Sequence, residues 1–233
     1  MKKAIRIIAL LVVAGLLIAL MIFNMSSKPS NSETVWDERT TIGNIDAKNY
    51  YVMYTDLACP YCSVFSRLIM ENEDEFKRDY IEGKDILYEV RVTDFLYEYG
   101  GNDIEMSRWG AEGVYCATKE DKFWEYYHGA LKSLWDDYHS KGIGVSKTAT
   151  PIDGMTRDYW VKIGEKIGFD KNEFSDCMSN SNTIQAIKDN TAKAAKIVDG
   201  GLPYFVFGKF KTGGFDNNWD WSYVKQYLDA GLK

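Results

Sequence analysis

The segment YYVMYTDLACPYC, residues 50–62, decides the fold of this chain of 233 residues. Its first part, Tyr50 to Thr55, is a run of aromatic and β-branched residues, which is typical of a buried strand. Pro60 suits the first position of a helix, because the N–H that it lacks would have no partner there. Apolar residues follow at helical spacing from Val64 to Ile69. The segment therefore predicts a strand, a short turn and a helix, with Cys59 at the start of the helix.

The rest of the chain alternates strand and helix patterns. Ile86 to Val92 again has the composition of a strand, and so does the aromatic run from Tyr204 to Phe207. Between them the periodicity is helical almost throughout. The helices expected there span residues 104–118, 123–134, 157–167, 171–178 and 183–197. A last amphipathic helix is expected from Trp221 to Leu228. We therefore predict an α/β fold into which an all-helical domain is inserted.

The N-terminal residues have the composition of a membrane anchor. Lys2, Lys3 and Arg6 precede Ile7 to Phe23, a stretch without any charged or polar side chain. As a helix this stretch would rise about 26 Å, against about 30 Å for the hydrocarbon core of a bilayer. A cleavable signal peptide has a shorter apolar region followed by a small-residue cleavage site, and this sequence has no such site. We therefore expect an uncleaved transmembrane helix, with the positive end in the cytoplasm and the rest of the chain outside.

These patterns divide the chain into consecutive parts. Residues 1–25 form the cytoplasmic tip and the transmembrane anchor, and the polar residues 26–41 form a tether. Residues 42–102 and 199–233 form the two parts of one domain, and residues 103–198 form the helical insertion between them. The expected location is the cell membrane, with a single-pass anchor and the domain outside the cytoplasm.

Charge and composition exclude several classes of function. The net charge of −6 and the pI of about 5.1 leave no basic surface for nucleic acid. The two histidines, His128 and His139, are too few for a histidine-rich metal centre. We therefore expect no nucleic-acid partner, no metal and no cofactor.

The motif Cys59-Pro60-Tyr61-Cys62 carries the predicted chemistry. Backbone N–H groups and the dipole at the start of the helix would stabilise a thiolate at Cys59 and lower its pKa from the usual value of about 8.5. Cys62, one turn inside the helix, would resolve a mixed disulfide by closing the Cys59–Cys62 bond. Two alternatives are half of a zinc site, for which the other two cysteines supply no second Cys-x-x-Cys pair, and a purely structural disulfide.

Four segments around and beyond this motif share one resemblance. They are GNIDA at 43–47, YVMYTDLACPYC at 51–62, Cys116-Ala117 with KFWEYYH at 122–128, and GLPYFVFG at 201–208. Together they resemble the DsbA-like family of thiol:disulfide oxidoreductases. The resemblance implies a thioredoxin-like fold with a helical insertion. It also implies the oxidation of thiols in exported proteins, with reoxidation by a membrane oxidase of the DsbB or VKOR kind.

The resemblance assigns roles by position. It makes Cys59 the nucleophile, Cys62 the resolving thiol, and Pro60-Tyr61 the dipeptide between them. Pro203 would be a cis-proline beside these cysteines, because a cis bond before proline costs little. Leu202 would then expose its backbone to an extended substrate strand. Without the resemblance, Pro203 would be an ordinary turn proline after Gly-Gly.

Some positions depart from the family pattern. Met53 stands where many thioredoxin-like proteins place a buried carboxylate, so proton transfer to the resolving thiol would need water or another group. Asp56 and Glu89 are candidates that lie near in sequence, but we expect each to be a solvated or capping carboxylate. Leu202 replaces the commoner Val or Thr, which leaves substrate preference open. Tyr61 replaces the His of the most oxidising members, so we expect a less extreme oxidant.

Cys116 and Cys177 lie in two different predicted helices. Outside the cytoplasm unpaired thiols are disfavoured, so a disulfide between them is plausible. It would close a loop of about 60 residues and contribute roughly 4 kcal/mol in the chain-entropy model. The alternative is that each is a small apolar residue buried separately in a helix face.

The sequence leaves three functions open. The first is an extracytoplasmic enzyme that oxidises dithiols of exported proteins. The second is a reductase or isomerase of the same fold, since the direction depends on the stability of the reduced form. The third is a membrane-tethered binding or holdase module whose cysteines are structural.

Overall fold

The computed structural model describes residues 35–100, 104–146, 149–215 and 220–233. The expected transmembrane helix at 1–25 and the first part of the expected tether lie outside the described residues. Within the described ranges, no helix is both long enough and apolar enough to cross a membrane.

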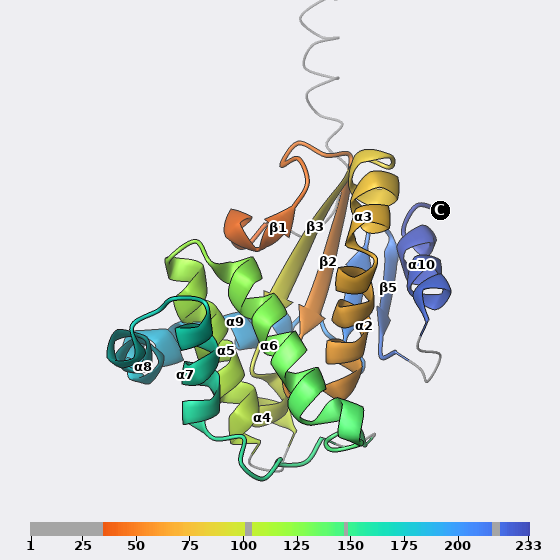
Figure 1. Cartoon of the computed structure of the whole chain (residues 1–233). Helices are drawn as coiled ribbons and strands as arrows, with labels where there is room; N and C mark the ends of the chain where they lie inside the picture. The colour runs from red at the N-terminus through yellow and green to blue at the C-terminus, as the bar shows by residue number, and fades with distance from the viewer. Residues whose placement is uncertain (1–34, 101–103, 147–148, 216–219) are drawn as a thin grey trace, which may run out of the picture. The chain divides into compact units, whose positions relative to one another are not determined.

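A mixed sheet of five strands forms the centre of the described part of the chain (Figure 1). The strands are β1 (Thr41–Ile42), β2 (Asn49–Thr55), β3 (Ile86–Val92), β4 (Tyr204–Phe207) and β5 (Phe210–Gly213). Their order across the sheet is β1-β3-β2-β4-β5. β2 runs parallel to β3 and antiparallel to β4, so that Met53 pairs with Val90 on one side and with Phe205 on the other.

The two central strands, β2 and β3, lie where the sequence predicts them. Successive side chains of a strand point to opposite faces, so Tyr51 and Met53 enter one hydrophobic cluster while Val52 and Tyr54 enter another. A parallel pair requires a crossover connection. This connection consists of α2 (Pro60–Glu71), α3 (Glu73–Phe76) and the π-helical turn η2 (Lys77–Glu82). The helix that begins at Pro60 therefore packs on the face that carries Met53.

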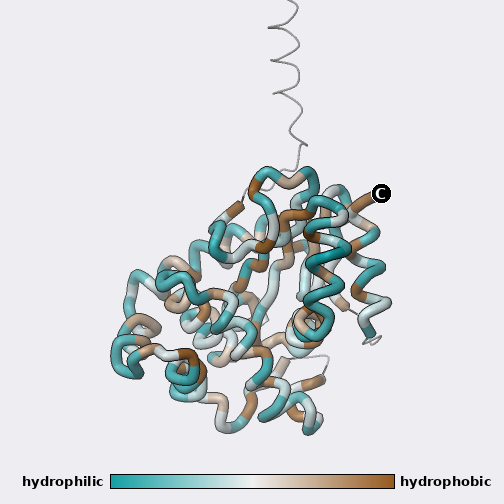
Figure 2. The backbone as a smooth tube through the Cα atoms, turned by 45° about the horizontal axis from the view of Figure 1, so that its top comes forward, coloured by the Kyte–Doolittle hydropathy of each residue, from teal (hydrophilic) through white to brown (hydrophobic). Residues whose placement is uncertain are grey.

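α2 and α10 (Trp221–Ala230) cover this face of the sheet. The Tyr51 ring stacks on Phe207 with 4.6 Å between the ring centres, and its hydroxyl donates to the Leu228 carbonyl at 2.8 Å. Phe65 of α2 is fully buried in the same core. Burying one such side chain contributes about 1.5–3 kcal/mol. Figure 2 shows that the helices carry hydrophobic and hydrophilic residues along the same helix.

α9 (Ser181–Ala194) and the residues that follow it cover the opposite face. Ala194 and Val198 pack there with Val52 and Val206. The end of the predicted insertion, 103–198, therefore belongs to the layer that covers the sheet. The described part of the chain is one compact unit, in which the helical insertion and the sheet are packed together.

A buried ion pair between Glu89 and Arg91 lies on this second face. Arg91 Nε donates to Glu89 at 2.9 Å, and both side chains are almost inaccessible to water. The backbone N–H of Trp36 donates to Glu89 at 2.9 Å, and the Arg91 guanidinium lies 4.2 Å from the centre of the Trp36 ring. These contacts correct two expectations. Glu89 is not solvated, and residues 35–41, which we assigned to the tether, are packed on the domain.

The helices of the insertion pack around α5. They are α5 (Glu105–Lys119), α6 (Phe123–Asp137), α7 (Arg157–Lys166) and α8 (Lys171–Ser179), together with α9, and α4 (Phe95–Tyr99), which precedes the insertion, also packs on α5. All except the short helix α4 were predicted from the sequence. Gly113 allows α5 to approach α6 closely, because a Cβ there would lie 2.0 Å from the Tyr126 hydroxyl. That hydroxyl donates to the Trp160 carbonyl of α7 at 3.0 Å, which joins three helices.

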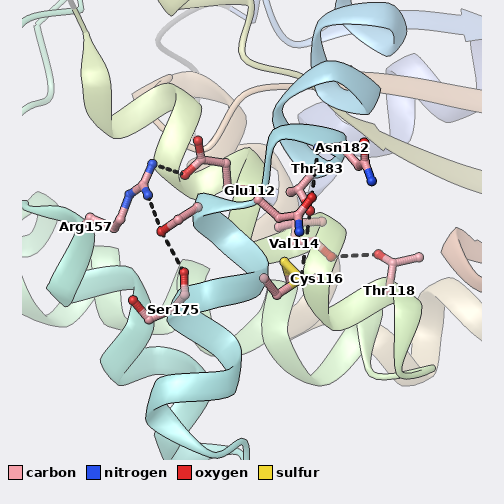
Figure 3. The surroundings of a disulfide bond; sticks show 11 residues. Glu112, Val114, Cys116, Thr118, Arg157, Ser175, Asn182 and Thr183 are labelled. Atoms are coloured by element: carbon pink, nitrogen blue, oxygen red, sulfur yellow. Dashed lines mark hydrogen bonds and ion pairs between the residues drawn. A yellow bond between two sulfur atoms is a disulfide. The ribbon is translucent and has the colours of Figure 1, made fainter.

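A disulfide joins Cys116 of α5 to Cys177 of α8, with 6.0 Å between the two Cα atoms. The expected pairing is present, and the alternative of two separately buried thiols is wrong. Close to it, Arg157 of α7 contacts the buried Glu112 at 2.8 Å and the Ser179 hydroxyl at 2.7 Å (Figure 3). The disulfide and these polar contacts tie α5, α7 and α8 together.

We expect the double variant Cys116→Ala with Cys177→Ala to be less stable than the wild type. The two residues are 61 positions apart, and closing a loop of this length contributes up to about 4 kcal/mol through the entropy of the unfolded chain. Urea denaturation would measure the free energy of unfolding, and the wild type in reducing agent serves as the control. An unchanged free energy would show that the disulfide adds no stability.

Candidate active site

Cys59 occupies the N-cap position of α2, directly after the turn that leaves β2. Its backbone is extended, with φ −87° and ψ 115°, and its carbonyl accepts the Ser63 N–H at 3.1 Å as the first bond of the helix. Pro60 follows at the first helical position, as predicted. Both cysteines of the motif are reduced in this structure, with 6% of Cys59 and 1% of Cys62 exposed. Cys59 is therefore the more accessible sulfur.

The cis-proline loop lies against Cys59. The peptide bond between Leu202 and Pro203 is cis, as the resemblance predicted. The Cys59 thiol donates to the Leu202 carbonyl across 3.6 Å. The tertiary structure thus brings Leu202 next to a residue 143 positions earlier in the chain.

The two thiols have different surroundings. Burial raises the pKa of the Cys62 thiol well above its usual value, and the adjacent Cys59 sulfur adds to this rise. The Asp56 backbone N–H and the Thr55 hydroxyl face the Cys62 sulfur and act in the opposite direction on this pKa. Cys62 is therefore protonated at neutral pH. A protonated, buried thiol suits the resolving role better than the role of first nucleophile.

An open groove of about 570 Å³ runs beside Cys59. Its walls come from the start of α2, from α4, from the cis-proline loop and from the chain after β5. The lining residues are Cys59, Pro60, Tyr61, Phe95, Leu96, Tyr99, Gly100, Ala149, Gly200, Gly201, Leu202, Gly214 and Phe215. None of them is charged. Tyr99, at the end of α4, is 56% exposed. The groove therefore suits an apolar or uncharged stretch of polypeptide next to a cysteine.

Asp56 is buried beneath this groove and holds its parts together. One carboxylate oxygen accepts the Ala58 N–H at 2.8 Å in the active-site turn. The other accepts the Leu96 N–H of α4 at 2.9 Å and the Ser107 hydroxyl of α5 at 2.7 Å. Burial raises the pKa of the Asp56 carboxyl to about 6. The expected solvation is wrong, because three donors satisfy a side chain that water does not reach, whereas the expected capping role is present in the bonds from the Ala58 and Leu96 N–H groups.

Many thioredoxin-like proteins place a buried carboxylate at the position that Met53, an apolar residue, occupies in this chain. Met53 is fully buried, and its sulfur accepts the Tyr88 hydroxyl at 3.5 Å. Glu89 cannot replace that carboxylate, because it lies beside Val52 in the register of the sheet and so faces away from α2. Neither residue gives Cys62 a carboxylate partner.

The remaining cysteines are distant from this site in the sequence and are bonded to each other. Among the described residues, no three His, Cys, Asp or Glu side chains gather in a way that could hold a metal ion. Cys116 and Cys177 therefore do not complete a zinc site with the active-site pair.

Comparisons with known proteins agree with this arrangement. A family model described as thioredoxin matches residues 36–209, which include the sheet strands β1 to β4, both active-site cysteines and Pro203. The chain belongs to the thioredoxin family. A search of curated protein sequences finds no match.

Solved structures share the fold at low sequence identity. Oxidised BdbD from Bacillus subtilis has a TM-score of 0.61 and 16% identity, covering 88% of this chain and 96% of BdbD. DsbA from Chlamydia trachomatis has a TM-score of 0.57 and 14% identity, covering 85% of this chain and 92% of its own. A thioredoxin-like oxidoreductase from Silicibacter pomeroyi has a TM-score of 0.55 and 16% identity, covering 85% of this chain and 98% of its own.

The family match and these structures confirm two predictions. The fold is thioredoxin-like with additional helices, and the resemblance to DsbA-like proteins holds at the level of the fold. The sequence missed the groove wall formed by Phe95, Leu96 and Tyr99. The only local signal for it was the aromatic content of this segment, which a core helix would share.

We expect Asp56→Asn to change how stability depends on pH. The pKa of about 6 in the folded protein lies above the unfolded value of about 3.9, so the folded state binds the proton more tightly. The contribution of Asp56 to the free energy of unfolding therefore falls, by roughly 2 kcal/mol, as the pH rises from about 4 to about 6. Urea denaturation of both proteins across this range would measure the fall in the wild type alone.

The comparison isolates Asp56 from its buried neighbour Asp94, whose carboxyl pKa is also raised by burial and which both proteins retain. A difference in unfolding free energy between wild type and Asp56→Asn that stays constant from about pH 4 to about pH 6 would contradict the assignment.

Proposed function

We propose that this chain is an extracytoplasmic thiol:disulfide oxidoreductase that oxidises dithiols of exported proteins through Cys59 and Cys62. One observation carries the proposal: the Cys59 thiol lies at a helix N-terminus, against the Leu202 carbonyl of a cis-proline loop, and opens into a groove whose described lining residues are all uncharged. A thiol used only for structure needs neither the loop nor the groove.

The reaction begins with the oxidised Cys59–Cys62 pair. A substrate thiolate attacks the Cys59 sulfur and forms a mixed disulfide, while the Cys59–Cys62 bond breaks and Cys62 leaves as a thiolate that takes up a proton. A second substrate thiolate then attacks the substrate sulfur of the mixed disulfide and releases Cys59 as a thiolate. The substrate loses two electrons and becomes a disulfide, and the enzyme gains them as two thiols.

The groove positions the substrate during this exchange. An extended substrate segment beside Leu202 pairs with the backbone of the cis-proline loop, which places the substrate sulfur opposite Cys59. The start of α2 supplies backbone N–H groups and a favourable dipole for the developing negative charge on Cys59. Tyr61 and Tyr99 provide apolar surface with polar edges for the neighbouring substrate side chains.

The second pair of cysteines supports the proposed compartment. A disulfide between Cys116 and Cys177 persists where the surroundings are oxidising and is uncommon in the cytoplasm. The apolar segment from Ile7 to Phe23 then holds the domain on the outer side of the cell membrane. Reduced enzyme is reoxidised there by a membrane oxidase of the DsbB or VKOR type, whose disulfide accepts attack by Cys59.

Trapping of mixed disulfides tests the catalytic roles. We expect Cys62→Ser to accumulate mixed disulfides with substrate, because the resolving thiol is missing, and Cys59→Ser to form none. Pro203→Thr should lengthen the life of the adducts, because it disturbs the backbone that positions the substrate. Non-reducing gels of cells expressing each variant give the measurement.

Two further outcomes of the same experiment decide between functions. Adducts with Cys59→Ser and none with Cys62→Ser would reverse the two roles. If no variant trapped substrate and the wild type failed to oxidise a reduced test protein, a binding module would replace the enzyme. The reduction potential in a glutathione buffer sets the direction, since a value near about −120 mV supports an oxidase and one near about −270 mV a reductase.

The membrane topology is a separate prediction. We expect the full chain to remain in the membrane fraction after washing at high salt, with its domain accessible to protease only from outside. Immunoblotting of fractionated cells and of protease-treated spheroplasts gives the measurement. A mature, soluble protein that begins near residue 27 would replace the anchor with a cleaved signal peptide.

A further inference from the structure

Cys62 needs a path for its proton. The buried carboxylate that many thioredoxin-like proteins have near the resolving thiol is replaced by Met53 in this chain. In the proposed reaction Cys62 takes up a proton when it leaves Cys59, and it loses one when it attacks a mixed disulfide. Cys62 is 1% exposed, so bulk water does not supply this path directly. Met53 offers a thioether that already accepts the Tyr88 hydroxyl, and Glu89 faces the other side of the sheet.

Asp56 does not provide the path either. Both of its carboxylate oxygens accept donors of the groove wall, from Ala58, Leu96 and Ser107. The part of Asp56 that faces Cys62 is its backbone N–H, which cannot accept a proton. The acceptor must therefore come from another group around the Cys62 sulfur.

The Thr55 hydroxyl is the side-chain group that meets these requirements. It lies at the end of β2 against both the Cys62 sulfur and the Tyr127 hydroxyl of α6, and it acts on the pKa of each. It is buried, and it makes no hydrogen bond of ordinary length and angle in this structure, so its contacts with both groups are loose. A hydroxyl with no fixed partner can rotate to accept from one neighbour and donate to the other.

A second contact extends this path into α2. The Tyr127 hydroxyl and the Ser66 hydroxyl lie 2.7 Å apart, a short hydrogen bond in which either oxygen can be the donor. Both side chains are buried. Thr55, Tyr127 and Ser66 therefore form a row of three neutral hydroxyls that starts at the Cys62 sulfur.

The row ends at a small cavity. Ser66 and Tyr127 border a space of about 20 Å³, which is large enough for one water molecule. Glu73 of α3 and His128 of α6 border the same space, and both are partly exposed to solvent. Burial lowers the pKa of His128, so its imidazole is neutral at pH 7 and can accept a proton.

We propose that the hydroxyls of Thr55, Tyr127 and Ser66 carry the proton between Cys62 and the cavity bordered by Glu73 and His128. This inference rests on the proposed function. When Cys62 attacks a mixed disulfide, its proton passes to Thr55 while Thr55 passes its own to Tyr127, and so on to the cavity. The Cys62 thiolate then bonds to Cys59, and the substrate sulfur leaves with the electron pair of the broken bond. The reverse movement protonates Cys62 when it is the leaving group.

A chromogenic aromatic disulfide tests the proposal on the full chain in detergent. Reduced enzyme attacks this reagent through Cys59 and releases one coloured thiolate, and the attack of Cys62 on the mixed disulfide releases a second. Stopped-flow absorbance therefore records both steps as separate phases. We expect Thr55→Val to slow the second phase about tenfold at neutral pH, because a positioned proton acceptor is lost. The first phase should keep its wild-type rate.

The pH profile separates proton transfer from a change in packing. The slowing of the second phase by Thr55→Val should disappear at high pH, where Cys62 is already a thiolate. If the substitution instead misplaced the Cys62 sulfur, the second phase would be slow at every pH. Tyr127→Phe should show the same profile, which covers the case that Thr55→Val does not fold. Ser63→Ala is the matched control, because it removes another buried hydroxyl of α2 that lies outside the row.

The outcomes distinguish the inference from the function on which it rests. A wild-type second phase in both Thr55→Val and Tyr127→Phe, or an equal slowing by Ser63→Ala, would overturn the proton path and leave the enzyme assignment intact. Absence of a second phase in the wild type would remove the proposed function itself, because Cys62 would then not resolve a mixed disulfide.

Discussion

The shape of the groove depends on the hydrogen bonds that the buried carboxylate of Asp56 accepts. It accepts three donors from three elements: the Ala58 N–H of the active-site turn, the Leu96 N–H of α4 and the Ser107 hydroxyl of α5. Because the carboxyl is fully buried, each lost bond would leave a polar group without water to replace its partner. The turn that presents Cys59 and the helix that forms the opposite wall are therefore held at a fixed separation. The cost is a carboxylate that ionises less readily than usual, as its raised pKa shows.

The two faces of the sheet carry different side chains, neutral under the cysteines and charged on the opposite side. Residues of β2 that face α2 lie under the cysteines, and this side is neutral, with the thioether of Met53 and the hydroxyl of Thr55. The other side carries the buried charges Glu89 and Arg91, which pair with each other and hold Trp36. A buried ion pair with further hydrogen bonds tolerates its low-dielectric surroundings, whereas a lone carboxylate under Cys62 would raise the thiol pKa further by repulsion. The charged groups of the strands thus lie on the face where they do not disturb the thiols.

A neutral proton path fits this arrangement. Hydroxyl groups exchange protons without carrying charge, so Thr55 and Tyr127 can serve a buried sulfur without the desolvation cost that a carboxylate would incur. Two residues that are adjacent in the chain also have different roles. Asp56 positions the groove through its side chain, while Thr55 faces the sulfur. The helical insertion contributes to both, since Ser107 comes from α5 and Tyr127 from α6, and the disulfide between α5 and α8 keeps this layer together.

Local patterns in the sequence determined the strands β2, β3 and β4, most helices and the reactive pair, because a strand period of two, a helix period near 3.6 and a proline at a helix start are set by neighbouring residues. They also placed Cys59 at the helix end, whereas the cis-proline loop at Pro203 was expected only from the family resemblance. Only the tertiary structure decided which side chains meet across long separations. It buried Asp56 under three donors, turned Glu89 to the far face, placed Thr55 against Tyr127 and packed residues 35–41 on the sheet. Burial and register depend on contacts between segments far apart in the chain, which the composition of each segment does not specify.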